Sequence, residues 1–260
     1  MPRYFLEVAY KGSAYSGFQL QENANTVQAE IEKAFNILFQ LPSPLSVEGQ
    51  EWRMTGSSRT DAGVHAVQNF FHFDSILPLH QWKGIEGEAN FTYKMNAILP
   101  ADIVIKTINR VSDTAHCRFD AISREYNYYI YRQKDPFLKD RAFFFPYKLD
   151  IEKMQQAAII LKGYSDFTSF SKRKTQVKSF ICQIAESKWL FEENCLVYNV
   201  KANRFLRGMV RALTATMLKV GRGKISLDEF RKIIEAKDCT KASFAVPAHG
   251  LFLVEVCFNN

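Results

Sequence analysis

The sequence predicts an α+β protein in which helices pack on a sheet. Segments rich in aromatic and β-branched residues alternate with segments whose apolar residues recur at helical spacing. This mixture of strands and helices is present in both halves of the 260-residue chain. The composition, with 47% hydrophobic and 23% charged residues, is that of a globular protein and argues against disorder.

In the first half, the expected elements are a strand over residues 4–10, a helix opened by a capping box at Asn25 and Gln28 and running to Leu38, and a strand over 67–74. The strand over 67–74 is apolar on more than one face, which is typical of a central strand. Segments 41–60 and 75–92 are polar or contain Pro and Gly, and they predict long loops or hairpins.

The second half repeats this order of elements without a clear sequence repeat. We expect a strand over 124–132, a helix from Asp150 to Gly163, strands over 180–190 and 195–202, a helix from Phe205 to Gly221, a helix opened by a capping box at Ser226 and Glu229, and a last strand over 251–258. We place the boundary between the two halves at residue 108, so the domains are 1–108 and 109–260.

Positive charge is concentrated in the second part of the chain. Residues 1–100 carry 7 Lys and Arg against 10 Asp and Glu, whereas residues 101–260 carry 27 against 17, and the formal net charge is +7. A polyanion such as RNA requires a surface of this kind, although lysine-rich surfaces also serve solubility alone.

Several classes of protein are disfavoured. No apolar run is long enough to cross a bilayer, and acidic Glu7 interrupts any N-terminal signal peptide. Five scattered cysteines without a Cys-x-x-Cys pair fit a reducing cytoplasm and form no zinc framework. The five histidines show no metal-ligand spacing, and a P-loop and a Rossmann glycine pattern are both absent, so we expect no metal and no cofactor.

The segment 55–66, with the sequence TGSSRTDAGVHA, is the candidate site. It is small and polar, contains glycine, and directly precedes an apolar strand, so it could hold the carboxylate of Asp61 at the mouth of that strand. Asp and Gly are also common in turns for conformational reasons alone, and from the residues by themselves the turn is the favoured interpretation.

Residues 59–66, RTDAGVHA, closely resemble the motif of the TruA-type tRNA pseudouridine synthases. Other segments resemble further blocks of that family in the family's order: GFQLQ at 17–21, AHCRF at 115–119, REY at 124–126, DFTSF at 166–170, NRFLRGMVR at 203–211 and GLFLV at 250–254. The matches extend from about residue 3 to residue 257.

This resemblance implies a fold and an activity. The two α+β halves would share one continuous mixed sheet, with a central RNA-binding cleft between them. Members of the family isomerise uridine to pseudouridine in the anticodon stem-loop of tRNA, typically at positions 38, 39 and 40. They use no cofactor and act as homodimers.

The resemblance also assigns roles to individual residues. Asp61 matches the catalytic carboxylate, Tyr126 the active-site tyrosine, which also contacts the base, and Arg211 the basic partner of the carboxylate. Leu251 matches the apolar wall against which the target base rests. Arg59 matches the arginine that enters the space vacated when the nucleotide flips out.

Chemistry supports these roles, and three of the residues have an alternative. Leu251 could equally be an ordinary strand leucine. Exchanging a C–N glycosidic bond for a C–C bond requires a carboxylate that acts covalently or stabilises a sugar cation. By spacing alone, Arg211 would lie with Arg204 and Arg207 on a solvated helix face. Tyr126 could instead be a core aromatic, and its phenol, with an ordinary pKa near 10, is a poor base at pH 7.

Further RNA contacts follow from the matched blocks and from the densest basic run in the chain. They are assigned to His116, Arg118, Phe119, Phe170, Lys172, Arg173, Lys174, Lys178 and Arg207. One departure is Ser58, which stands where the family usually has glycine and would be uncomfortable if that position required positive φ. The alternatives to the synthase are a non-catalytic RNA-binding or RNA-folding protein and the same isomerisation on another RNA.

Overall fold

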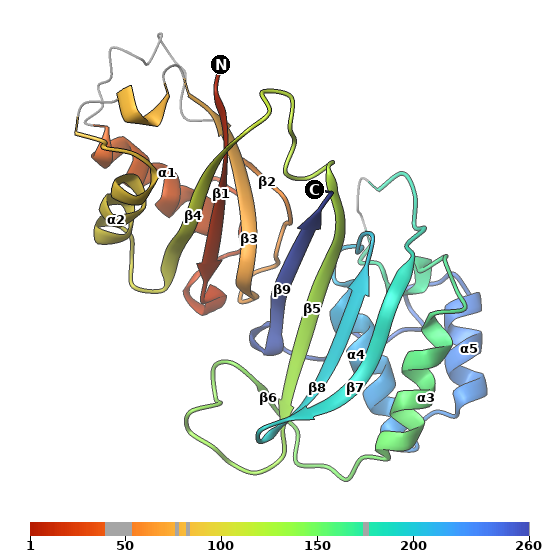
Figure 1. Ribbon diagram of the computed structural model, residues 1–260. Coiled ribbons are helices and arrows are strands. Elements are labelled where there is room, and N and C mark those ends of the chain that lie inside the picture. The colour runs from red at the N-terminus through yellow and green to blue at the C-terminus, as the bar shows by residue number, and fades with distance from the viewer. Residues whose placement is uncertain (40–53, 76–77, 82–83, 174–176, 260) are drawn as a thin grey trace. The chain divides into compact units, whose positions relative to one another are not determined.

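The computed structural model describes residues 1–39, 54–75, 78–81, 84–173 and 177–259. Within these residues the strands form one mixed nine-stranded sheet, whose hydrogen-bonded order is β4-β1-β3-β9-β5-β8-β7, with β2 on β3 and β6 on β5. Five α-helices accompany the strands in this part of the chain (Figure 1). The α+β class is therefore confirmed.

The chain divides into two compact units, which we describe separately. Unit 1 comprises residues 1–122 and 253–260, and unit 2 comprises residues 123–252. The strands β5, Ala121–Tyr131, and β9, Leu251–Phe258, have residues in both units.

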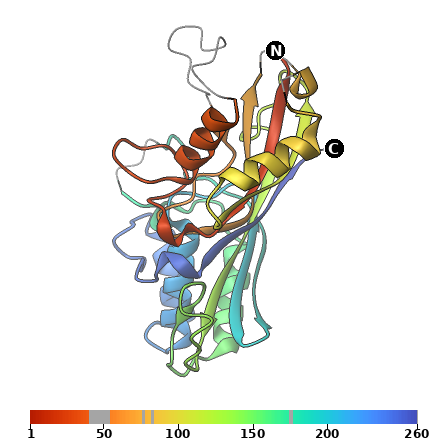
Figure 2. The ribbon, with the colours of Figure 1, turned by 90° about the vertical axis from the view of Figure 1, so that its left-hand side faces the viewer.

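In unit 1, the remaining elements are β1 Arg3–Tyr10, α1 Val27–Leu38, β2 Thr55–Gly56, β3 His65–Asp74, α2 Glu88–Ile98 and β4 Ile103–Val111. The strand β1 pairs antiparallel with β3 on one side and β4 on the other. The helices α1 and α2 pack on each other, and α2 packs on β4 (Figure 2). The ring of Phe35 in α1 meets Phe73 of β3 and Phe91 of α2 edge-on, and all three are buried. Each such ring stabilises the fold by roughly 2–3 kcal/mol.

In unit 2, the remaining elements are β6 Phe143–Phe144, α3 Ile151–Leu161, β7 Ile184–Glu192, β8 Cys195–Ala202, α4 Met209–Gly221 and α5 Leu227–Glu235. The strand β8 pairs antiparallel with β5 and β7. The helix α3 packs on β7 and α4, and α5 packs on α3 and α4. Almost every residue of α4 is buried, so this helix forms the centre of the helical layer.

Most predicted elements are present with close bounds, and four predictions are wrong. The strand expected over 180–190 begins only at Ile184, as β7. The cap of α1 is Thr26, whose hydroxyl accepts from the backbone N–H of Ala29 (3.2 Å). The Gln28 side chain, expected to complete a capping box with Asn25, donates to the Met54 carbonyl instead (3.1 Å). The helix α4 begins at Met209, so Phe205 precedes it. Segment 75–92 is not all loop, since α2 begins at Glu88; residues 40–53, 76–77 and 82–83 lie outside the described residues.

The strand β4 was not predicted because its apolar residues do not alternate strictly. Ile103, Ile105 and Ile108 are all buried, although the step from 105 to 108 is odd. The pairing with β1 contains a register shift between Glu7 and Val8, where Lys106 is left without an opposite residue in β1. Such a bulge returns the following side chains to the buried face.

Candidate active site

Asp61 lies in a tight turn at the entrance to β3. The Asp61 carbonyl accepts a hydrogen bond from the Val64 backbone N–H (3.1 Å), and Gly63 between them has φ of +77°. A turn of this kind needs glycine at its third position, because other residues rarely adopt positive φ. The turn interpretation and the catalytic one are therefore compatible, since the turn fixes the half-buried Asp61 at this point of the backbone.

A buried amide holds the backbone just before this turn. Asn69 is fully buried on β3, and its Oδ1 accepts from the Ser57 hydroxyl (2.8 Å) while its Nδ2 donates to the Ser58 carbonyl (3.0 Å). The same Nδ2 donates to the Tyr10 hydroxyl (3.2 Å), which pairs with the Thr60 hydroxyl (2.8 Å). Residues 57, 58 and 60 are thus all tied to one side chain, directly or through Tyr10.

The sequence contained a signal for Asn69 that we did not use. Asn69 is in phase with Phe71 and Phe73, both of which are buried. A polar side chain on the core face of a strand requires hydrogen-bonding partners. Its presence there therefore indicates a buried network.

Ser58 is not strained in place of the usual family glycine. Positive φ among the described non-glycine residues occurs at Asn23, Glu193 and Lys237, and not at Ser58. Its hydroxyl is instead buried without a hydrogen-bond partner, which among the described residues is also true of Nε1 of Trp189 and Oδ1 of Asn199. An unsatisfied buried hydroxyl of this kind costs about 1–3 kcal/mol.

A pocket of about 330 Å³ in unit 1 brings three of the matched blocks together. It is lined by Phe18, Gln19, Leu20, Gln28, Met54, Thr55, Gly56, Arg59 and Arg118. Arg59 and Arg118 are both exposed, so two predicted RNA-contact cations from distant parts of the chain reach the same pocket. Two guanidinium groups at one opening favour an anionic ligand.

The turn containing His116, Arg118 and Phe119 is anchored to the sheet by Cys117. The fully buried Cys117 thiol donates to the Thr55 carbonyl (3.0 Å) and lies 3.2 Å from Nδ1 of His72 on β3. His116 Nδ1 accepts from the backbone N–H of Arg118 (3.2 Å) and Phe119 (3.3 Å). This arrangement leaves the Phe119 ring 74% exposed, as a surface on which a base could stack.

Unit 2 holds the other predicted catalytic residues. Tyr126 is on β5, buried, with its ring edge-on to Phe205 at 5.1 Å. Arg211 is in the first turn of α4 and donates from Nε (3.1 Å) and Nη2 (2.6 Å) to the Val246 carbonyl. Leu251 is buried at the start of β9.

Two alternatives from the sequence can now be judged. Arg204 and Arg207 precede α4, so they do not share a helix face with Arg211. The second alternative, a core role for Tyr126, agrees with its burial (8% exposed). Tyr128 on the same strand is a core tyrosine: it is fully buried and donates to the Pro247 carbonyl (2.8 Å), and burial raises its pKa.

The remaining predicted RNA contacts differ in exposure. Arg173, Lys178 and Arg207 are exposed, and Lys172 is half-buried, whereas Lys174 lies outside the described residues. Phe170 is fully buried and packs on Phe167 and Phe230. Its ring has no free face for RNA, and we assign it to the hydrophobic core.

Across the described ranges, no group of three or more His, Cys, Asp or Glu side chains is arranged to hold a metal ion. All five cysteines are free thiols. No described helix has the length and apolar character needed to span a membrane.

The family model of the tRNA pseudouridine synthases matches residues 7–120 and 157–259. The chain belongs to this family. A tRNA pseudouridine synthase A of Parabacteroides distasonis is 44% identical over 259 residues, which are 99% of this chain and 96% of that protein. The enzymes of the same name from Porphyromonas gingivalis and Staphylococcus aureus are 43% and 36% identical, covering 99% and 98% of this chain and 98% and 91% of those proteins.

Membership in the tRNA pseudouridine synthase family confirms the resemblance on which the residue roles were based. The chain is an isomerase. The family model covers Asp61, Arg211 and Leu251, whereas Tyr126 lies between its two matched segments.

Proposed function

We propose that this tRNA pseudouridine synthase isomerises uridine in the anticodon stem-loop, at positions 38, 39 and 40, with Asp61 as the nucleophile. The observation that carries the proposal is the position of Asp61. Asp61 follows a backbone segment tied to the buried Asn69 network, and its own carbonyl closes a turn at Val64. Fixing the backbone at this residue restricts the positions from which its carboxylate can reach a substrate.

The reaction is an isomerisation, so uridine and its product have the same composition. The C1′–N1 bond breaks, the base turns within the site, and a C1′–C5 bond forms as the C5 proton is released and a proton is taken up at N1. Asp61 acts in its ionised form, either by attacking the ribose carbon or by first adding to the base. Both orders require the same carboxylate.

The other proposed groups divide the remaining work. Arg211 stabilises the charge of the carboxylate, and its guanidinium is oriented by the two hydrogen bonds that it donates to the Val246 carbonyl. Tyr126 positions the uracil and assists the loss of the C5 proton, and Leu251 supplies an apolar surface for the base. Arg59 stacks in the space left by the flipped nucleotide, because a guanidinium both stacks on bases and binds phosphate.

Binding of tRNA is proposed to use cations and aromatic groups from both units. In unit 1 these are His116, Arg118 and Phe119, and in unit 2 Lys172, Arg173, Lys178 and Arg207, with Lys174 from the segment outside the described residues. The exposure of Phe119 and Arg118 supports this assignment. A-form RNA is bound largely through its backbone and shape, which suits a dispersed set of cations.

We further propose that the enzyme is a cytoplasmic homodimer. The five free thiols are compatible with a reducing compartment. The dimer rests on the family resemblance, and light scattering at micromolar concentration tests it: a monomer would refute this part of the proposal.

The decisive experiment compares Asp61→Asn with the parent enzyme. Tritium release from [5-³H]uridine-labelled tRNA should fall below detection for Asp61→Asn, because an amide neither attacks the ribose nor stabilises its cation. Binding of tRNA should persist in this variant. Asp113→Asn, which changes an exposed carboxylate of the same unit, serves as the control and should release tritium like the parent.

Site mapping on the product completes the test. Modification at positions 38, 39 and 40 supports the proposed substrate. If tritium were released only from an RNA other than tRNA, the same chemistry would be assigned to that other substrate. Absence of release from every RNA, with binding retained, would instead indicate the non-catalytic RNA-binding protein.

A further inference from the structure

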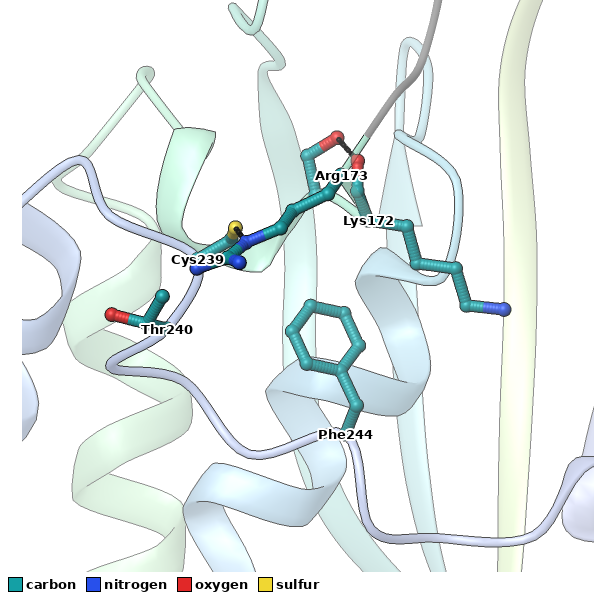
Figure 3. A pocket seen from close by; sticks show the side chains of 6 residues that line it. Lys172, Arg173, Cys239, Thr240 and Phe244 are labelled. Carbon is teal, nitrogen blue, oxygen red and sulfur yellow. Dashed lines mark hydrogen bonds between the residues drawn. The ribbon is translucent and has the colours of Figure 1, made fainter.

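A second pocket, in unit 2, carries an inference that deepens the proposed function and rests on it. The pocket has a volume of about 280 Å³ and lies between two loops of the chain. Its walls are formed by Ser171, Lys172, Arg173, Cys239, Thr240 and Phe244 (Figure 3). The RNA contacts predicted from the sequence include Lys172 and Arg173 of the cationic wall, whereas the wall containing Phe244 was given no role.

The cationic wall is held against the start of α4. The Lys172 backbone N–H donates to the Arg207 carbonyl (3.0 Å). Gly208, which caps α4, has φ of +74°, and a side chain there would come within 3.1 Å of the Lys172 side chain. The stem of Lys172 therefore passes directly over a position that must remain free of a side chain.

The opposite wall is fixed by hydrogen bonds at both ends. The Asp238 carboxylate accepts from the Thr240 backbone N–H (2.8 Å) and hydroxyl (2.7 Å). The backbone N–H of Ser243 donates to Oγ1 of Thr216, a fully buried residue of α4 (3.1 Å). Phe244 follows directly, so its backbone is set by the helix.

The two walls are joined across the pocket. Nε of Arg173 donates to Sγ of Cys239 (3.4 Å), which orients the planar guanidinium along the pocket. Figure 3 shows the ring of Phe244 pointing toward Arg173 from the other side, while the Lys172 side chain runs along the edge with its ammonium group directed outward. The pocket is therefore formed before any ligand binds.

The walls combine one half-buried aromatic ring with two cations. Single-stranded nucleic acids are bound by this combination, in which a base stacks on an aromatic face and cations neutralise the backbone. The position in the fold agrees with such a role. The Lys172 backbone is hydrogen-bonded to Arg207, two residues before α4, and Val246, two residues after Phe244, accepts from Arg211 in the first turn of that helix. Both walls are therefore attached near the start of α4.

We propose that this pocket binds one unpaired nucleotide of the tRNA substrate, with its base stacked on Phe244 and its phosphate bound by Lys172 and Arg173. The nucleotide must be unpaired and unstacked on one side, because a base inside an A-form helix offers no free face. Phe244 is thus a substrate-binding residue, and Cys239 positions the Arg173 guanidinium.

Phe244→Leu and Phe244→Tyr test the proposal in the full-length enzyme. Leucine retains an apolar side chain without a flat ring, and we expect the dissociation constant of an anticodon stem-loop RNA to rise about 5- to 100-fold. Tyrosine keeps the ring and should remain within about twofold of the parent. Phe191→Leu, at a 67% exposed phenylalanine of β7, is the control and should bind like the parent.

A spectroscopic test does not depend on the stability of the leucine variant. In Phe244→Trp, addition of the stem-loop RNA should quench the emission of the introduced indole, relative to the parent, because the base stacks on it. Phe191→Trp should show no such quenching. The pocket assignment would be overturned if Phe244→Leu bound the RNA as tightly as the parent, or if the emission of Phe244→Trp did not change at saturating RNA. Tritium release by the parent would still support the proposed function in either case. Absence of turnover by the parent would overturn both.

Discussion

At the scale of single residues, the loop that carries the proposed nucleophile Asp61 depends on a side chain to which we assign no chemical step. The amide of Asn69 makes all four of the hydrogen bonds available to it, two as acceptor and two as donor, and three of its partners belong to Ser57, Ser58 and Tyr10. Asn69 is therefore a positioning residue for the segment that precedes Asp61. Misplacing a reacting group by about 1 Å can cost roughly 100-fold in rate.

We predict that Asn69→Ala lowers kcat about 10- to 100-fold while the dissociation constant for tRNA changes little. The matched control is Asn96→Ala, since the Asn96 amide also bridges a backbone, donating to the Ile105 carbonyl and accepting from its N–H at 2.8 Å each. Both variants should lose about 1–3 kcal/mol of unfolding free energy. Single-turnover rates at saturating tRNA measure the difference, and equal rate losses in the two variants would contradict the positioning role.

At the scale of elements, β3 links the Asp61 turn to the turn at 116–119. His72 lies on this strand and accepts from the Cys117 backbone N–H at Nδ1 (3.4 Å), which requires the neutral imidazole. The pKa of His72 is lowered to about 4, first by burial and then by His116 and Arg3, against the opposing effect of Asp74 and Asp120. Protonation of His72 at Nδ1 removes the acceptor of this hydrogen bond, so the contact between β3 and the turn at 116–119 is sensitive to acid.

This pKa predicts how stability depends on pH. Because the folded pKa lies below the ordinary value near 6.5, the unfolded chain takes up a proton that the folded chain does not. The contribution of His72 is complete above pH 6.5 and is lost as the pH falls toward 4. Between pH 7.5 and 5 we expect a loss of about 2 kcal/mol in unfolding free energy.

Urea unfolding at pH 7.5, 6 and 5 measures this dependence. The unfolding free energy of His72→Gln should fall less between pH 7.5 and 5 than that of the parent. His80→Gln changes an exposed histidine of the same unit and should leave the loss unchanged. A parent curve that is flat over this interval would contradict the assignment to His72.

At the scale of the whole molecule, charge determines how the enzyme meets its substrate. The net charge of +7 arises from residues 101–260, which contain 27 basic and 17 acidic residues. Binding of cations to phosphates releases counterions, so affinity for tRNA should fall steeply as salt rises. Lysines already paired within the protein contribute less to this effect than those at the RNA surface.

We predict that the double substitution of Lys172→Gln with Arg173→Gln makes the slope of log affinity against log salt shallower by about 2, or about 1 for each phosphate that is no longer neutralised. The control double variant, Lys153→Gln with Lys188→Gln, removes the same charge from lysines that pair with Asp150 (3.0 Å) and Glu186 (2.7 Å). Filter binding between 50 and 200 mM salt, conditions in which such slopes are well resolved, measures both. A parent affinity that does not change with salt would exclude Lys172 and Arg173 as phosphate contacts.

Sequence by itself determined the class of the fold, most of its elements and the family. The strand β9, the helix α1 and the capping box at Ser226 lie where local pattern placed them, because the apolar period and the capping chemistry involve residues close together in the chain. The motif around Asp61 identified the candidate nucleophile for the same reason: its residues are consecutive.

Only the tertiary structure decided which distant residues support those motifs. Asn69 reaches Tyr10 across 59 positions, Cys117 reaches Thr55 across 62, and Arg173 reaches Cys239 across 66. The strand β4 was missed because a bulge in its pairing with β1 interrupts the alternation. Such contacts exist only after strands and helices have paired, since each depends on the register and packing of two segments rather than on the preference of either one.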